Sequence, residues 1–152
     1  MLKERGSVLL EALIAILIFS LGVLGVAGLQ ANSIKDSADA KYRAEAAFLA
    51  NQLVSQMMVD QKNIASYAGE DGEGPAFKQK WFEQAQQLLP NAGATVQVNE
   101  NACAAVVTVT LGWCSPEEKE KHGGCAINED GILYLHQHSI VNRIATQAIC
   151  EA

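Results

Sequence analysis

The chain has 152 residues, of which 49% are hydrophobic, and a formal net charge of -6. Its 17 carboxylates outnumber its 11 Lys and Arg side chains, so the chain lacks the basic surface that binds nucleic acid or anionic lipid headgroups. It also lacks a nucleophile elbow, a phosphate loop, a zincin helix and a paired-carboxylate spacing. We therefore expect neither an enzyme nor a nucleic-acid-binding protein, and no cofactor.

An apolar segment lies close to the N-terminus. From Ala12 to Leu29 its only polar side chain is Ser20, and a helix of this length spans roughly 27 Å, close to the thickness of a bilayer core. Glu11 stands at the start of this segment. An ionised carboxylate within lipid costs about 2.5 to 3.5 kcal/mol unless it has a partner. Glu11 is therefore a candidate functional residue.

The segment has two simpler interpretations. A cleaved secretory signal has a core of about 7 to 15 apolar residues and a small-residue cleavage site, and this run is longer. A plain single-span anchor would only require Glu11 to reach the membrane interface. If the segment is an anchor, whether or not Glu11 is functional, Lys3 and Arg5 favour a cytoplasmic N-terminus. The rest of the chain would then lie on the other side of the membrane.

The first sixty residues resemble a known family. The sequence KERG over residues 3–6, followed by SVLLEALIAILIF over residues 7–19, is similar to the class III signal sequence of type IV pilins and of secretion-system pseudopilins. The continuation over residues 20–30 and YRAEAAFLANQL over residues 42–53 resemble the PilV family of minor pilins, the type IV pilus modification proteins. The match is close to about residue 60 and loose afterwards.

The resemblance implies a processing and assembly pathway. A prepilin peptidase would cut after Gly6, and Ser7 would become the N-methylated first residue. Glu11 would pair with the N-terminal amine of a neighbouring subunit during docking into the fibre. The family usually has Phe where this chain has Ser7. The implied partners are the prepilin peptidase, the inner-membrane assembly platform, other minor pilins, the major pilin and a tip adhesin.

The resemblance also implies a location and leaves an alternative within the same class. The chain would sit in the inner membrane with a periplasmic head and then enter the pilus at the cell surface. A minor pseudopilin of type II secretion would have nearly the same N-terminus. An uncleaved, anchored periplasmic binding module is the alternative from another class. We divide the chain into a leader (1–6), a transmembrane half-helix (7–29), an amphipathic half-helix (30–67) and a head (68–152).

The amphipathic half-helix shows one apolar stripe. Its residues recur at steps of three, four and seven, as on a helix that packs against a sheet or another helix. They are Tyr42, Ala46, Leu49, Leu53, Met57 and Ile64. We expect the long helix to end near Tyr67.

The remaining pattern predicts an α+β head. A loop rich in Gly and acid is expected over residues 69–75, followed by a helix over 77–89. Strands are predicted over residues 95–98, 104–111 and 132–141. A long helix, a short helix and antiparallel strands together are what a pilin-like fold would show.

Three further expectations concern side chains of the head. Trp81 should lie in the core. Val107, Val109 and Leu111 should share one face of their strand, with Val106, Thr108 and Thr110 on the other. His136 and His138 lie on one side of theirs, and we expect that face to be solvated or partly covered.

All four cysteines lie in the head, which an oxidising compartment would pair as disulfides. Four cysteines allow three connectivities. We favour Cys114 with Cys125, closing the charged loop 115–124, and Cys103 with Cys150. The alternative is zinc held by Cys114, His122 and Cys125, but the chain lacks paired C-x-x-C motifs and we predict no metal.

Overall fold

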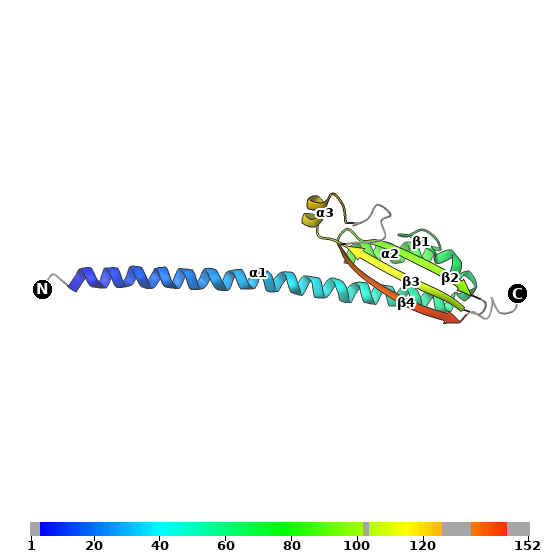
Figure 1. The fold of residues 1–152 in the computed structure, drawn as a ribbon, viewed down its shortest axis with the longest axis horizontal. Coiled ribbons are helices and arrows are strands. Elements are labelled where there is room, and N and C mark those ends of the chain that lie inside the picture. Colours follow the sequence, from blue (N-terminus) through cyan, green and yellow to red (C-terminus); the bar gives the residue numbers. More distant parts are fainter. Residues whose placement is uncertain (1–3, 102–103, 126–134, 146–152) are drawn as a thin grey trace. The chain divides into compact units, whose positions relative to one another are not determined.

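The computed structural model describes residues 4–101, 104–125 and 135–145 (Figure 1). Contacts within the chain divide it into two compact units, residues 1–40 and residues 41–152. The elements are, in chain order, α1 (Glu4–Val59), the 3-10 helix η1 (Gln61–Tyr67), β1 (Gly69–Glu70), α2 (Ala76–Leu88), β2 (Gly93–Asn101), β3 (Ala104–Trp113), α3 (Pro116–His122) and β4 (His136–Ala145). The predicted α+β class is confirmed, with a long N-terminal helix and a small antiparallel sheet as in a pilin-like fold.

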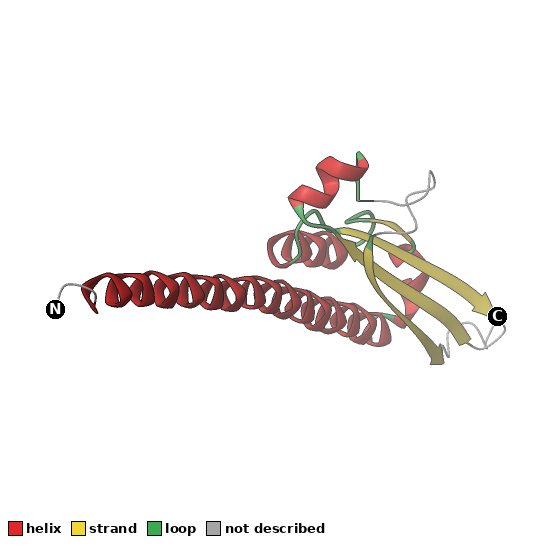
Figure 2. Ribbon diagram, turned by 60° about the vertical axis from the view of Figure 1, so that its left-hand side comes forward, coloured by secondary structure: helices red, strands yellow, loops and turns green. Residues whose placement is uncertain are grey.

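The sheet has four antiparallel strands in the order β1-β2-β3-β4, which is also their order in the chain (Figure 2). β3 is its centre. It pairs with β2 from Ala104 to Gly112 and with β4 along its whole length. The predicted alternation on β3 is confirmed, because Val107, Val109 and Leu111 are fully buried and the residues between them are partly exposed.

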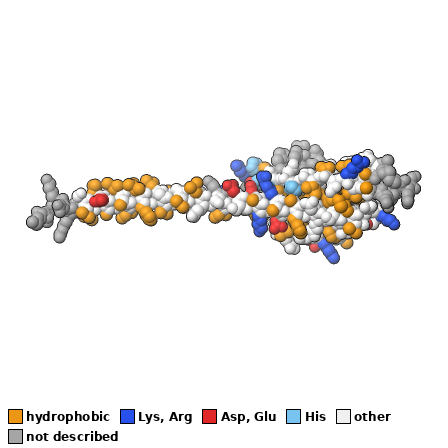
Figure 3. All heavy atoms as spheres, turned by 90° about the horizontal axis from the view of Figure 1, so that it is seen from below, with side chains coloured by type: hydrophobic (Ala, Val, Ile, Leu, Met, Phe, Trp, Pro, Cys, Tyr) orange, Lys and Arg blue, Asp and Glu red, His pale blue; other side chains and the backbone are white. Residues whose placement is uncertain are grey.

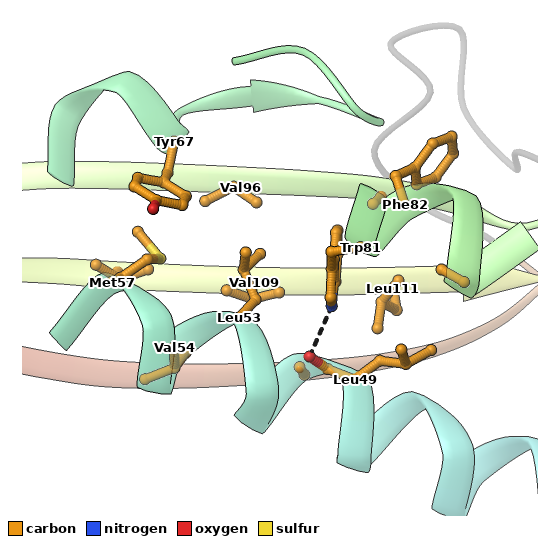
Figure 4. Packing of buried hydrophobic residues seen from close by; sticks show 14 of the residues in the cluster. Leu49, Leu53, Val54, Met57, Tyr67, Trp81, Phe82, Val96, Val109 and Leu111 are labelled. Carbon is orange, nitrogen blue, oxygen red and sulfur yellow. Dashed lines mark hydrogen bonds between the residues drawn. The ribbon is translucent and has the colours of Figure 1, made fainter. Parts of the chain in front are cut away.

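The core of the head lies between this sheet and the helices that cover one of its faces (Figure 4). The predicted stripe of α1 supplies one wall, since Ala46, Leu49, Leu53 and Met57 are completely buried. Trp81 enters from α2, and its indole Nε1 donates a hydrogen bond of 2.9 Å to the carbonyl oxygen of Leu49. Trp81 is therefore a core residue, as expected, and its polar atom is satisfied inside the apolar layer.

The long helix ends earlier than predicted. α1 stops at Val59 and the chain continues to Tyr67 as a 3-10 helix, with Asn63 in a non-helical conformation. The Asp60 carboxylate accepts hydrogen bonds from Asn63 Nδ2 at 2.8 Å and from the Tyr67 hydroxyl at 3.1 Å. These bonds join side chains within the turn that follows α1, and the apolar stripe alone does not reveal them.

Two predicted loops contain regular structure. Gly69 and Glu70 form β1, paired with Val96 and Thr95 of β2, where a loop was expected. The charged loop 115–124 contains α3, which has a capping box between Ser115 and Glu118 and a left-handed Gly123 at its C-terminus. The Ser-x-x-Glu spacing with Pro116 between them is a helix-start signal that the loop prediction overlooked.

The strand boundaries also differ from the prediction. β2 covers nine residues instead of the four predicted. β4 ends at Ala145, four residues beyond the predicted end, while residues 132–134 of that prediction lie outside the described residues. Pairing with β3 accounts for the added length, because β3 offers backbone partners to β2 from Ala104 to Gly112 and to β4 from Ala104 to Trp113.

Candidate functional site

The apolar part of α1 has no protein cover in the first unit. The helix is long and apolar enough to cross a membrane, with a mean hydropathy of 2.6 over its most apolar 18 residues and none of that stretch buried. Figure 3 shows hydrophobic side chains along this part of the helix. Leu17 is 59% exposed and Phe19 is 72% exposed. In water such an exposed surface is unfavourable, so this segment requires lipid or another protein.

The predicted processing and docking residues lie together at the beginning of α1. The helix starts at Glu4, so the bond between Gly6 and Ser7 lies within its first turns. Glu11 is exposed and four residues from Ser7, a spacing that places both on one face of a helix. If the chain were cut before Ser7, the positive charge of the new amino group would therefore lie on the same side of the helix as the Glu11 carboxylate.

The second group of candidate residues surrounds α3 in the head. The structure joins Cys114 to Cys125, the pair favoured from the sequence, across a separation of 11 residues. α3 itself has no buried residues. Besides the disulfide, two side-chain contacts hold α3 to the sheet and to the turn before β2. Glu118 Oε1 lies 3.0 Å from His136 Nε2, and Lys119 Nζ donates a hydrogen bond of 3.1 Å to Asn91 Oδ1. The covalent link and these two contacts fix its position.

The Glu118 carboxylate has an unusual electrostatic environment. The hydrogen bond from His136 and the backbone N–H of Ser115 lower the pKa of Glu118 to about 2, against the ordinary value of 4.5. His136 in turn stacks on Trp113, with ring centroids 6.2 Å apart and planes 17° from parallel. The histidines 136 and 138 both lie on a partly covered face, as expected.

A buried ammonium group anchors the turn after η1. Lys78 on α2 is completely buried, and its Nζ donates a hydrogen bond of 3.1 Å to the carbonyl oxygen of Gly69. Burial lowers the pKa of Lys78, and the carboxylates of Glu73 and Asp71 oppose that shift. Lys78 was not predicted to be buried, because its position on the buried side of α2 follows from packing.

The head also has a hollow lined by residues of α1 and by Phe77 of α2. It measures about 530 Å³, and Phe48, Val59 and Phe77 line it together with uncharged polar side chains. Phe48 and Val59 are exposed. The hollow also contains Gln52, whose side-chain oxygen is buried without a hydrogen-bond partner.

The metal alternative receives no geometric support within the described residues. No group of three or more His, Cys, Asp or Glu side chains there is placed to hold an ion. The thiolates of Cys114 and Cys125 that the zinc alternative required are joined to each other. The other favoured disulfide, Cys103 with Cys150, lies outside the described residues.

Comparison with known proteins adds no family. No protein-family model, curated protein or solved structure matches the chain.

Proposed function

We propose that this chain is a minor pilin of a type IV pilus. It is inserted in the inner membrane with a periplasmic head, is cut between Gly6 and Ser7 by a prepilin peptidase, and joins other minor pilins and the major pilin at the assembly platform. Its role is to prime the pilus or to form part of the tip complex. The observation that carries the proposal is an uncovered membrane-length helix that has Gly6-Ser7 in its first turns and Glu11 as the first charge after Ser7.

The physical argument for assembly starts from the uncovered helix. A plain anchor needs only apolar side chains, and a carboxylate beside them costs free energy unless it has a partner. Cleavage after Gly6 creates an amine at Ser7, and the amine of an adjacent subunit would neutralise Glu11 inside a fibre. In the fibre, apolar side chains of neighbouring helices would replace the lipid around this segment and pack against it.

The decisive measurement is the intact mass and N-terminal sequence of the membrane-extracted protein from cells with an active prepilin peptidase. A mature chain beginning at Ser7 is expected, with one added methyl group on its amine. A chain that still begins at Met1 would eliminate the pilin proposal and leave an uncleaved anchor.

The role of Glu11 is tested separately. Glu11→Ala should leave membrane insertion intact and reduce incorporation into sheared fibres, because the docking charge is lost. The control is Asp36→Ala, which removes an exposed carboxylate of α1 outside the apolar segment. Normal incorporation of the Glu11 variant would show that this carboxylate does not select the docking register.

A deletion strain distinguishes pilus from secretion apparatus. Loss of surface pili with intact protein export is the expected phenotype. Lost export with intact pili would instead assign the chain to the type II secretion pseudopilins.

A further inference from the structure

The last part of α1 carries an uncharged surface with several exposed apolar side chains. From Ala46 to Val59 the chain contains no ionisable side chain. Besides Val141, the exposed large hydrophobic side chains of the described head are Phe48, Met58 and Val59, all on this stretch of α1. Exposure of such a cluster to water is unfavourable, and clusters of this kind mark interaction surfaces.

The hollow of about 530 Å³ follows the same stretch of α1. The α1 residues that line it recur at steps of three and one, so they share one face of the helix over a length of about 17 Å. They are Phe48, Asn51, Gln52, Ser55, Gln56 and Val59. Phe77, in the first turn of α2, lines the hollow as well. A groove of this length along one helix matches a second helix laid beside it better than a single compact ligand.

The polar side chains of the hollow offer hydrogen-bond acceptors. Asn51 Nδ2 donates a hydrogen bond of 2.7 Å to the carbonyl oxygen of Ala47, and Ser55 Oγ donates one of 2.7 Å to that of Asn51, so these donors are engaged with the backbone of α1. The side-chain oxygen of Gln52 is buried and accepts no hydrogen bond. A buried acceptor without a donor is unfavourable. A ligand that brings an N–H group to Gln52 therefore gains more than apolar contact alone.

Tryptophan is the side chain that fits this combination of walls and acceptors. Its indole is planar and apolar, so it can pack against Phe48 and Phe77, and its N–H group is a donor only. The residues that line the hollow include no ionisable side chain, so they offer no partner to a charged ligand. A second copy of this chain does not supply the indole, because Trp81 and Trp113 are its two Trp residues and both are buried.

We propose that the hollow formed by α1 and Phe77 binds an amphipathic helix of another protein that inserts a Trp side chain. The indole packs against Phe48 and Phe77 and donates its N–H to the side-chain oxygen of Gln52. An apolar residue seven positions away on the partner helix, two turns along the same face, covers Val59. This interaction surface belongs to the head and is independent of the proposed pilin function.

A labelled helical peptide tests the surface. The probe has about 15 residues, with one Trp and one Leu seven positions apart on an uncharged face and with Glu and Lys on the other face. Its binding to the full chain in lipid nanodiscs is followed by fluorescence anisotropy, and binding to empty nanodiscs is subtracted. Saturable binding is expected. Phe48→Ala should weaken it at least about tenfold, and the head should still fold because the Phe48 side chain is 59% exposed.

Two valines provide a matched pair of variants. Val59 lines the hollow and Val141 on β4 does not, although both are exposed. Val59→Ala should weaken binding of the Trp probe about two- to fivefold, because apolar contact is lost. Val141→Ala should leave binding unchanged. Equal effects of the two substitutions would place the peptide elsewhere on the head and overturn the site.

The hydrogen bond to Gln52 is tested by removing each of its partners. A probe with benzothienylalanine in place of Trp keeps the shape of the ring and lacks the N–H group. It should bind the original chain about three- to tenfold more weakly than the Trp probe does. The two probes should bind equally to Gln52→Met, which has no acceptor at this position. The same ratio of affinities for both chains would overturn the role of Gln52.

The remaining outcomes decide between the possible occupants of the hollow. Binding of the Trp probe that depends on Phe48 and Gln52 supports the proposal, whichever N-terminus the mature chain has. Absence of saturable binding above that of empty nanodiscs would overturn it. Self-association of the chain that Phe48→Ala abolishes, without binding of either probe, would assign the hollow to a second copy instead.

Discussion

The N-terminal helix and the head contain the same types of apolar side chain, but these are exposed in the N-terminal helix and buried in the head. Leu17 in the first unit is 59% exposed, whereas Leu49 in the head is completely buried. The head completes its core with its own sheet and α2, while residues 8–29 have no such cover in the first unit. Since full burial of a Leu side chain contributes about 1.5 to 3 kcal/mol, the first unit requires an apolar environment supplied by something other than its own residues.

Removing one large side chain from each region tests this difference in burial most directly. Trp81→Ala should lower the free energy of unfolding of the head by about 3 to 5 kcal/mol, because it leaves a cavity and removes the hydrogen bond to Leu49. Leu17→Ala should leave head unfolding unchanged. Denaturant unfolding of the full chain in detergent, followed by near-UV circular dichroism, measures both. Equal destabilisation by the two variants would contradict the division into an independent core and an uncovered helix.

The disulfide provides the next largest effect. Replacing Cys114 and Cys125 by Ser together should destabilise the head by about 3 kcal/mol, since the unfolded chain is no longer restrained across 11 residues. Hydrogen exchange should rise most in α3, which has no buried side chains to hold it. Retained protection of α3 in the double variant would show that its contacts with His136 and Asn91 suffice.

A substitution of one glycine in each region tests the same difference through the backbone. Gly74→Ala should cost about 1 to 3 kcal/mol, because Gly74 has φ of +118° and an added Cβ would lie 2.6 Å from the Ser66 carbonyl oxygen. Gly25→Ala in the N-terminal helix meets nothing within 4 Å and should leave head stability unaltered. Thermal unfolding of both variants checks this. A tolerated Gly74→Ala would show that the turn relaxes to another conformation.

The smallest effect is a pH dependence of the head. The pKa of Glu118 is about 2 in the folded chain and 4.5 ordinarily, so its contribution is complete above about pH 4.5 and is lost as the pH falls toward 2. The side chain is 36% exposed, and solvent screening limits the contribution to less than about 1 kcal/mol. Glu118→Gln should flatten the stability profile over that window, and Glu117→Gln, on the same short helix, should not. Parallel profiles for the original chain and the Glu118 variant would exclude the ion pair as a stabilising contact.

Periodicity predicted much of the fold because packing follows from it directly. The stripe from Ala46 to Met57 and the alternation on β3 each repeat at the period of one element, so the buried face could be identified without knowing what covers it. The errors lie where single side chains decide the backbone. α1 ends where the Asp60 carboxylate accepts two local side-chain hydrogen bonds, and Ser115 with Glu118 starts a helix inside a charged segment.

The candidate functional residues also fall into two groups, those that were predicted from the sequence and those that were not. Glu11 was predicted from the sequence because a carboxylate beside an apolar segment is costly, whereas Gly6 and Ser7 were predicted from the family resemblance. Lys78 and the pair of Glu118 and His136 were not predicted. Each depends on which strands and helices become neighbours, and residues 18 positions apart, as Glu118 and His136 are, show no shared pattern in the chain.

The α+β class, the membrane-length helix and the buried stripe of α1 could be predicted from the chain alone, since these depend on the order and period of apolar residues. That β3 lies between β2 and β4, that Lys78 is buried and that Glu118 and Lys119 of α3 contact His136 and Asn91 became evident only from the folded head. Burial and strand order are properties of the assembled head. They arise from contacts between distant residues, which hydrophobic patterning along the chain does not specify.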